Sequence, residues 1–260
     1  GRLAGSVPAA SRVRVAILDT GADCTHPDFM DTVGATTDPS GVSHFASALS
    51  TAIVPTTIAT PACAWQDDHG HGTHVAGILA AATNNGKGVA SVGFPSQLMI
   101  YKVMDRTGYG SDFGIANAIT MAADAGARII SMSLGGPGYS QMLQDAVDYA
   151  WARNVLVVAA AGNSNTATLF YPAGANYVLG VGATDSSDTR ASFSNFGFGL
   201  DVMAPGVNIL STYPGNRYGS MSGTSMATPI VSAVASLIAA STTDLASDAL
   251  AQRIEQSAES

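Results

Sequence analysis

Short apolar runs rich in β-branched residues alternate along the chain with longer stretches of helical periodicity. Three such runs have glycine close behind and are predicted to be buried strands: Val13–Leu18, Arg128–Leu134 and Val155–Ala160. Near them, Ile115–Ala125 and Gln141–Arg153 have the length and apolar spacing of helices. Strands that alternate with helices favour a parallel sheet. We therefore expect an α/β fold with a doubly wound, mostly parallel sheet and helices on both faces.

The polar residues that follow these strands are predicted to meet at one edge of the sheet. In a parallel sheet, ligands bind outside the carboxyl ends of the strands. Asp19, the Gly135–Gly136 turn and the Gly162–Asn163 turn each follow one predicted strand. By contrast, Asp31–Ala64 is rich in Thr, Ser, Ala and Pro without periodicity, which predicts a long loop. We see no repeat and no linker, so we expect residues 1–260 to form a single domain.

The amino-acid composition of the chain limits the classes of molecule that it could bind. The chain of 260 residues is 47% hydrophobic and 12% charged, which suits a compact globule and excludes disorder. Its formal net charge of -8 disfavours nucleic acid and anionic membranes as partners. The longest apolar run, Met226–Ala240, is interrupted by polar residues and is shorter than the ~20 residues of a bilayer span, so no membrane partner is expected. Cys24 and Cys63 could form one disulfide in an oxidising compartment or remain buried thiols.

Three of the five histidines lie in the segment DDHGHGTHVAG, residues 67–77. His71 and His74 could share a helix face as metal ligands, but the Glu of the HExxH motif is absent and no third ligand has zinc spacing. The alternative is a general base, flanked by glycines that let a substrate approach. A serine becomes nucleophilic when a base takes its proton and a carboxylate orients that base. Asp19, a histidine and Ser225 supply these parts, although a serine placed like Ser225 is often only a helix N-cap.

Five segments resemble the subtilases, the subtilisin-like serine proteases, and the pattern is nearest to the subtilisin and thermitase type. They are AILDTGADCTHPDF (16–29), DDHGHGTHVAGI (67–78), SMSLGG (131–136), AAAGNSN (159–165) and GTSMATP (223–229). The segments occur in the family's order and with its spacing across residues 13–241. The resemblance implies a subtilisin-like fold and a secreted, extracellular serine endopeptidase of broad specificity. It also implies protein or peptide substrates, an inhibitory pro-segment and a monomer.

Carried over by position, the resemblance makes Asp19 the orienting carboxylate, His71 the base and Ser225 the nucleophile, with His74 in a structural role. The oxyanion donors would be the Asn163 side chain and the backbone N–H of Ser225. The implied substrate-binding positions lie on both walls of a cleft: Gly108, Tyr109, Ser133, Leu134, Gly135, Gly136, Ala160, Gly162, Ser164 and Phe170. A catalytically silent binding module and an ester hydrolase are the alternative readings of the same pattern.

The walls around the expected S1 pocket are apolar and built of small residues, which predicts a hydrophobic side chain at P1, the residue before the cut bond. Ser164 is neutral and offers no carboxylate to Lys or Arg. Phe170 matches a floor position where family members often have a small residue. An inward Phe170 ring would favour Ala, Leu or Met at P1, whereas an outward ring would leave room for large aromatic groups. We expect the inward case.

The segment TNNGKGV, residues 83–89, resembles a calcium loop of thermitase-like subtilases. The implied Ca²⁺ ligands are the side chains of Asp28 and Asn85 and the carbonyls of Ala82, Lys87 and Val89. The alternative is a plain Asn-Gly turn. Both chain ends are shorter than is usual in the family, and only twelve residues precede Val13, so one ligand is missing and weak or absent calcium binding is expected.

The resemblance also changes the expectation for the two cysteines. Cys24 follows Asp19 by five residues, and Cys63 precedes His71 by eight. Because both flank triad segments that must lie close together, we expect a disulfide between them rather than two thiols.

Overall fold

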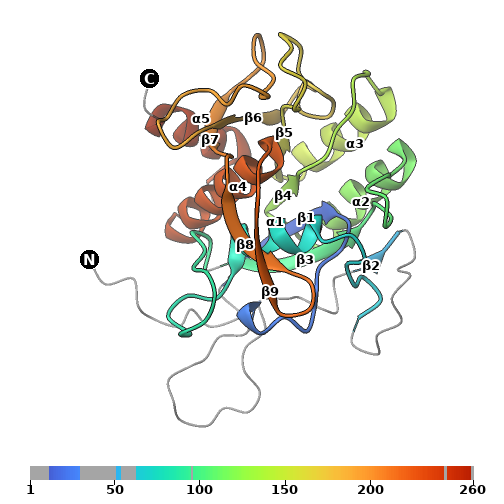
Figure 1. The fold of residues 1–260 in the computed structure, drawn as a ribbon. Coiled ribbons are helices and arrows are strands. Elements are labelled where there is room, and N and C mark those ends of the chain that lie inside the picture. The colour runs from blue at the N-terminus through green and yellow to red at the C-terminus, as the bar shows by residue number, and fades with distance from the viewer. Residues whose placement is uncertain (1–11, 30–50, 54–62, 95, 243–244, 259–260) are drawn as a thin grey trace.

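The centre of the molecule is a parallel β-sheet (Figure 1). The computed structural model describes residues 12–29, 51–53, 63–94, 96–242 and 245–258. Within these residues, seven strands lie in the order β2-β3-β1-β4-β5-β6-β7, and every neighbouring pair is parallel. The strands are β1 (Val13–Asp19), β2 (Thr51–Ala52), β3 (Ser96–Lys102), β4 (Ile129–Met132), β5 (Leu156–Ala160), β6 (Val178–Thr184) and β7 (Val202–Pro205). The expected α/β fold with a parallel sheet is confirmed.

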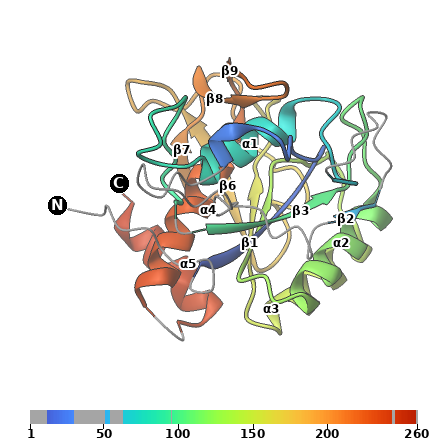
Figure 2. The same cartoon turned by 90° about the horizontal axis from the view of Figure 1, so that it is seen from below.

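Helices cover both faces of this sheet (Figure 2). Each face has its own hydrophobic core. The helices are α1 (His71–Ala80), α2 (Asp112–Asp124), α3 (Gln141–Trp151), α4 (Thr224–Ser241) and α5 (Ser247–Ser257), with a short 3-10 turn η2 (Pro27–Phe29). Helices α2 and α3 pack on one face, whereas α1 and α4 pack on the other with α5 beside α4. An antiparallel hairpin of β8 (Ile209–Tyr213) and β9 (Arg217–Met221) covers α1.

The elements expected from periodicity are present, with shifted ends. Helix α2 begins at Asp112, three residues earlier than predicted, because the Ser111 side chain accepts a hydrogen bond from Gly114 N and caps the first turn. The prediction of one unbroken loop over 31–64 was wrong at Thr51–Ala52, which pairs with β3. Most of that segment, 31–50 and 54–62, lies outside the described residues. The single domain over residues 1–260 stays a prediction.

Helix α4 is long and apolar enough to cross a membrane by length and composition alone. In this fold it is the core helix, because it packs against β4, β5, β6 and β7, and ten of its residues are buried. Its N-terminus and the first turn of α1 both face the carboxyl ends of the strands. The fold therefore brings Asp19, His71 and Ser225 to one edge of the sheet.

Candidate active site

Asp19 and His71 are held together where β1 ends and α1 begins. The Asp19 carboxylate is fully buried, and its Oδ1 atom lies 2.8 Å from His71 Nδ1. The same oxygen accepts a hydrogen bond from Thr20 N at 2.7 Å. Because a carboxylate is only an acceptor, Nδ1 carries the proton, and the neutral imidazole presents Nε2 as a base.

A second buried carboxylate, that of Asp67, fixes the start of α1. Its Oδ1 atom accepts from Thr20 Oγ1 and Gly70 N, and its Oδ2 atom accepts from Thr73 N. Thr20 Oγ1 in turn accepts from Gly72 N at 2.8 Å. These bonds satisfy N–H groups of the first helical turn, which have no partner inside the helix. They also tie the residue after Asp19 to the residue after His71, so the same hydrogen bonds position the Asp19 and His71 side chains.

The environment raises the pKa of His71. Burial disfavours the imidazolium and is the largest single influence, but the charge and hydrogen bond of Asp19, with the charge of Asp67, outweigh it. The pKa of His71 therefore lies above its usual value of 6.5. His74, one turn further on, is fully buried and has its Nε2 atom 2.9 Å from Gly219 O, so it does not face the catalytic group.

Ser225 lies in the first turn of α4, beside the end of β4. Pro229 has no N–H to donate to the Ser225 carbonyl, and the Ser133 hydroxyl donates to that carbonyl instead, at 2.7 Å. The Ser225 hydroxyl donates to Ser133 O at 3.2 Å. A proton transfer to His71 requires this hydroxyl to turn from that carbonyl towards the imidazole, a common difference between free enzymes and their substrate complexes.

The hydrogen bonds of the Asn163 side chain orient its amide NH₂ group as a donor for a ligand. Its Oδ1 atom accepts from Thr224 N at 2.8 Å and from Thr224 Oγ1 at 3.0 Å. Within the part of the chain that the structure describes, Nδ2 has no acceptor, so it can donate to a ligand that lies at the N-terminus of α4. That helix end favours negative charge through its dipole and its free N–H groups.

One cavity of about 370 Å³ connects these groups. His71, Asn163 and Ser225 all line it. Eight of the expected substrate positions also line it: Gly108, Ser133, Leu134, Gly135, Ala160, Gly162, Ser164 and Phe170. An imidazole held by a buried carboxylate, a serine at a helix N-terminus and an amide therefore border one space large enough for a side chain.

Two expected substrate positions lie outside this cavity lining. Gly136 exchanges two backbone hydrogen bonds with Tyr171, at 3.0 and 2.8 Å, and so closes the wall behind Gly135. The Tyr109 side chain is 72% exposed, and its backbone is bonded to Asp105.

Comparison with known proteins agrees with this geometry. The model of the subtilase family matches residues 10–260. The chain is 42% identical to thermitase from Thermoactinomyces vulgaris, over 91% of this chain and 78% of thermitase. It is 45% identical to subtilisin Savinase from Lederbergia lenta, over 88% of this chain and 76% of that protein. The chain belongs to the subtilase family.

A solved structure supports the same fold. A cold-adapted subtilisin-like serine proteinase superposes with a TM-score of 0.75 and 31% identity, covering 92% of this subtilase and 80% of that chain. A thermophilic serine proteinase from Bacillus sp. (strain AK1) is 43% identical over 88% of this chain, but this chain spans about half of its length, 53%.

The floor of the cavity in this subtilase is the Phe170 ring. A side-chain carbon added to Gly162 would lie 2.8 Å from Phe170 Cγ, and one added to Gly135 would lie 3.3 Å from Phe170 Cβ. The ring therefore lies against the backbone at Gly162, and Phe170 Cβ lies against Gly135. Its expected role in selecting the P1 side chain stays a prediction. Gly162 also has a φ of 107°, a left-handed conformation that favours glycine.

Sequence reasoning missed several residues that shape the site. Asn195 is fully buried: its Nδ2 atom donates to Ala161 O, and its Oδ1 atom accepts from Ser164 N. It thus holds the turn that carries Asn163. Thr20, His69, Met104 and Thr224 line the cavity but were not predicted there. The position of Asn195 between Phe193 and Phe196 is the sequence feature that could have indicated a buried asparagine.

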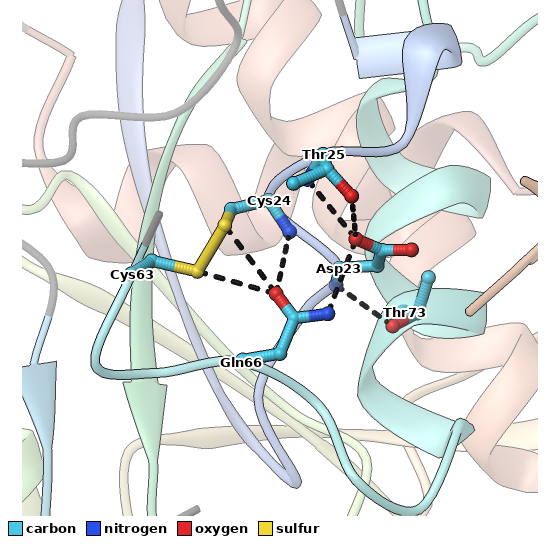
Figure 3. The surroundings of a disulfide bond; sticks show 6 residues. All are labelled: Asp23, Cys24, Thr25, Cys63, Gln66 and Thr73. Atoms are coloured by element: carbon cyan, nitrogen blue, oxygen red, sulfur yellow. Dashed lines mark hydrogen bonds between the residues drawn. A yellow bond between two sulfur atoms is a disulfide. The ribbon is translucent and has the colours of Figure 1, made fainter. Parts of the chain in front are cut away.

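The predicted disulfide between Cys24 and Cys63 is present, with the two Cα atoms 6.5 Å apart (Figure 3). Gln66 supports it. Its Oε1 atom lies 3.3 Å from both sulfur atoms and accepts from Cys24 N, and its Nε2 atom donates to Asp23 Oδ1. Asp23 also accepts from Thr25 and from Gly215 N of the β8–β9 turn, so the bridge belongs to a network that spans three segments.

The loop that resembles a calcium site is closed by hydrogen bonds. The buried Asp28 carboxylate accepts from Asn85 Nδ2 at 2.6 Å, from Val89 N at 3.0 Å and from the Tyr218 hydroxyl. Asn85 Oδ1 accepts from Lys87 N at 2.9 Å. Among the described residues, no three His, Cys, Asp or Glu side chains gather as metal ligands. Asp28 and Asn85 lie together as expected, but a cation would require the Asn85 amide to turn its oxygen inward, so the fit is partial.

Proposed function

We propose that this subtilase is a secreted serine endopeptidase of broad specificity that hydrolyses peptide bonds in proteins through Asp19, His71 and Ser225. The observation that carries the proposal is the 2.8 Å contact between His71 Nδ1 and Asp19 Oδ1 beside the cavity that Ser225 and Asn163 also line. An oriented base, a nucleophile and an oxyanion donor around one space are the parts that acyl transfer needs.

Each group has one task in this mechanism. His71 Nε2 takes the proton of the Ser225 hydroxyl while Oγ attacks the carbonyl carbon of the substrate, and Asp19 stabilises the imidazolium that forms. Asn163 Nδ2 and Ser225 N donate to the oxyanion of the tetrahedral intermediate. The imidazolium then gives its proton to the leaving amine, and the acyl-enzyme remains. A water molecule, deprotonated by His71, releases the acid product.

Substrate would lie along the strand exits as an extended chain. Ser133, Leu134 and Gly135 follow β4 and offer backbone groups, as does the opposing edge at Gly108. Main-chain pairing lets one site hold many sequences in the same shape. The disulfide favours an oxidising, extracellular location. We further propose that the enzyme is made with an inhibitory pro-segment and acts as a monomer.

Titration with a serine-directed phosphonylating reagent tests the proposal. We expect one equivalent to label Ser225 and to abolish casein digestion. A protein that takes up no reagent would be a silent binding module. A protein that hydrolyses a simple ester but leaves casein intact would be an esterase, and the endopeptidase proposal would then fail.

The pH dependence of kcat/KM follows from His71. Only the neutral imidazole can accept the serine proton, so activity falls as pH drops through the pKa of His71. Because that pKa is raised, we expect the acid limb to have its midpoint above pH 6.5. A pH series with a peptide substrate measures the midpoint, and a value clearly below 6.5 would contradict the assignment of His71 as the base.

The Phe170 ring is proposed to select Ala, Leu or Met at P1 over Phe or Tyr. Replacing Phe170 by Gly opens the floor of the pocket, so we expect kcat/KM for a Phe-P1 peptide to rise about 10-fold or more relative to its Leu-P1 counterpart. Phe113→Gly removes a ring that is 70% exposed, and it serves as the control. An aromatic preference that is unchanged in Phe170→Gly would show that this ring does not shape the pocket.

We propose that Asp28, Asn85 and the carbonyls of Ala82, Lys87 and Val89 hold Ca²⁺ weakly. Binding exchanges the hydrogen bond from Asn85 Nδ2 to Asp28 for coordination, so the net gain is small and the expected Kd is about 10⁻⁴–10⁻³ M. At ten times Kd, calcium should raise Tm by about 2–5 °C.

Thermal unfolding with and without calcium measures this shift, and Asp28→Asn should abolish it. Treatment with a chelator should leave a folded, active enzyme, because hydrogen bonds already close the loop. Unfolding of the chelated protein would contradict weak binding, and a Tm insensitive to calcium would rule the site out.

A further inference from the structure

Lys102, the last residue of β3, has a fully buried side chain next to the active site. Its Nζ atom donates to Asp68 Oδ1 at 2.6 Å, to Thr20 O at 2.7 Å and to Met104 O at 3.1 Å. An ammonium group has three protons, and each of them has an acceptor here. The Lys102 and Asp68 side chains are 0% and 2% exposed, so this is a buried ion pair.

The three acceptors belong to three different parts of the site. Thr20 directly follows Asp19 at the end of β1, and Lys102 is the residue of β3 paired with Asp19. Met104 lines the cavity. Asp68 lies in the segment 67–70 that leads into His71. One ammonium group therefore joins the residue after the catalytic carboxylate, one wall of the cleft and the approach to the catalytic base.

Stability alone does not account for this arrangement. The attraction within a buried ion pair is largely cancelled by the loss of hydration, and apolar residues of similar volume often stabilise a protein as well or better. The carbonyls of Thr20 and Met104 lie just beyond the ends of β1 and β3. A charged group with three donors can fix both carbonyls and Asp68 at once, which an apolar side chain cannot do.

We propose that Lys102 and Asp68 are a positioning pair for His71, which keeps the segment 67–70 against the ends of β1 and β3 so that the imidazole stays on the Asp19 carboxylate. This inference rests on the proposed triad and adds to it a pair of residues that do not touch the substrate. The pair also has an electrostatic role. Because the charges of Lys102 and Asp68 cancel, the intact pair has little effect on the pKa of His71. Either charge without the other would shift that pKa.

The other ionisable groups around His71 are few. Asp19 accepts from its Nδ1 atom, and Asp67 lies behind the helix start. His69 has its ring centre 6.3 Å from that of His71 and lines the cavity, and His74 lies one turn along α1. None of these residues is substituted in the variants, so shifts of the acid limb in opposite directions in the two single variants report the Lys102–Asp68 charges.

The test compares Lys102→Met, Asp68→Asn and the double variant. Lys102→Met removes the bonds to Thr20 and Met104 and leaves the Asp68 carboxylate without the charge of Lys102. We expect kcat to fall about 10- to 100-fold while KM changes by less than about threefold. We expect the acid limb of kcat/KM to move up by about half a pH unit. Asp68→Asn keeps an oxygen acceptor and leaves a lone cation, so kcat stays within about threefold and the acid limb moves down.

The double variant separates the two roles, because it is neutral again but still lacks the three donors. We expect its acid limb to return to the wild-type position while kcat stays low. Arg128→Met is the matched control. Arg128 also bridges segments, through bonds to Asn154 O and Leu245 O, but it precedes β4 at the opposite edge of the sheet. The Arg128→Met variant should be less stable than the wild-type protein, but its kcat and the midpoint of its acid limb should be unchanged.

Wild-type kcat in Lys102→Met, or acid limbs that move the same way in both single variants, would overturn the inference. An equal loss of kcat in Arg128→Met would also overturn it. If Lys102→Met does not fold, Asp68→Asn must still move the acid limb down, and the double variant must still return it to the wild-type position with a low kcat. The His71 pKa can also be followed by NMR in a Ser225→Ala background. If the wild-type protein does not cut peptides, the proposed function fails. The NMR measurement of the His71 pKa then still tests the Lys102–Asp68 pair, because it does not depend on activity.

Discussion

Replacing Ser225 by Ala is expected to lower kcat for a peptide substrate by about 10⁴- to 10⁶-fold. The change removes only the Oγ atom, so no acyl-enzyme can form, although His71, Asp19 and Asn163 keep their places. The oxyanion donors and substrate binding should still give a rate enhancement of about 10³-fold over the uncatalysed reaction. The fold should be unaffected, because the variant loses only the 3.2 Å hydrogen bond from Ser225 Oγ to Ser133 O and keeps the 2.7 Å bond from the Ser133 hydroxyl to the Ser225 carbonyl.

Single-turnover kinetics with purified Ser225→Ala measure this loss. Ser232→Ala is the matched control, because Ser232 is a buried serine on the same helix whose hydroxyl bonds to Ser131 Oγ behind the site. That variant should stay within about threefold of wild-type kcat. A Ser225→Ala protein that still forms a covalent ester with the phosphonylating reagent would place the nucleophile elsewhere.

The elements with uninterrupted apolar periodicity were predictable from sequence, and those with mixed composition were not. Strand β5 and the part of strand β1 from Val15 to Leu18 are apolar runs that the sheet buries, so their signal survives without tertiary information. Strand β6, VLGVGAT, contains two glycines that weaken any strand signal. Strand β3 ends in Lys102, and a lysine suggests an exposed position until its partners are known.

The candidate site shows the same division. Asp19, His71, Ser225 and Asn163 could be predicted together because short motifs resemble a family, and the motifs are local in sequence. The residues that hold those groups are distributed. Asp67, Asn195 and the Lys102–Asp68 pair act through hydrogen bonds between segments that are distant along the chain. Nothing in a single sequence says that two charged residues 34 positions apart will form a buried pair. Such contacts are decided by the packing of strand ends, which only the fold provides.

Replacing both cysteines, Cys24→Ser with Cys63→Ser, is expected to lower the free energy of unfolding by about 4 kcal/mol. The bridge closes a loop with a sequence separation of 39. In the chain-entropy model, its loss raises the conformational entropy of the unfolded chain and so lowers the free energy of the unfolded state by that amount. For a chain of this length the corresponding fall in Tm is roughly 8–12 °C. At 25 °C, kcat/KM should stay within about threefold of wild type, because Asp67 and not the disulfide ties the start of α1 to Thr20.

Reductant gives the internal control for this prediction. It should lower the Tm of the wild-type protein to that of the double serine variant and leave the variant unchanged, because the variant has no thiol left to respond. Gln66→Ala removes the side chain that bonds to Cys24 N and Asp23 but keeps the bridge, so it should cost less than half as much stability. If the double variant melts at the wild-type temperature, the bridge contributes nothing to stability. The network around Asp23 and Gln66 would then be what holds these segments together.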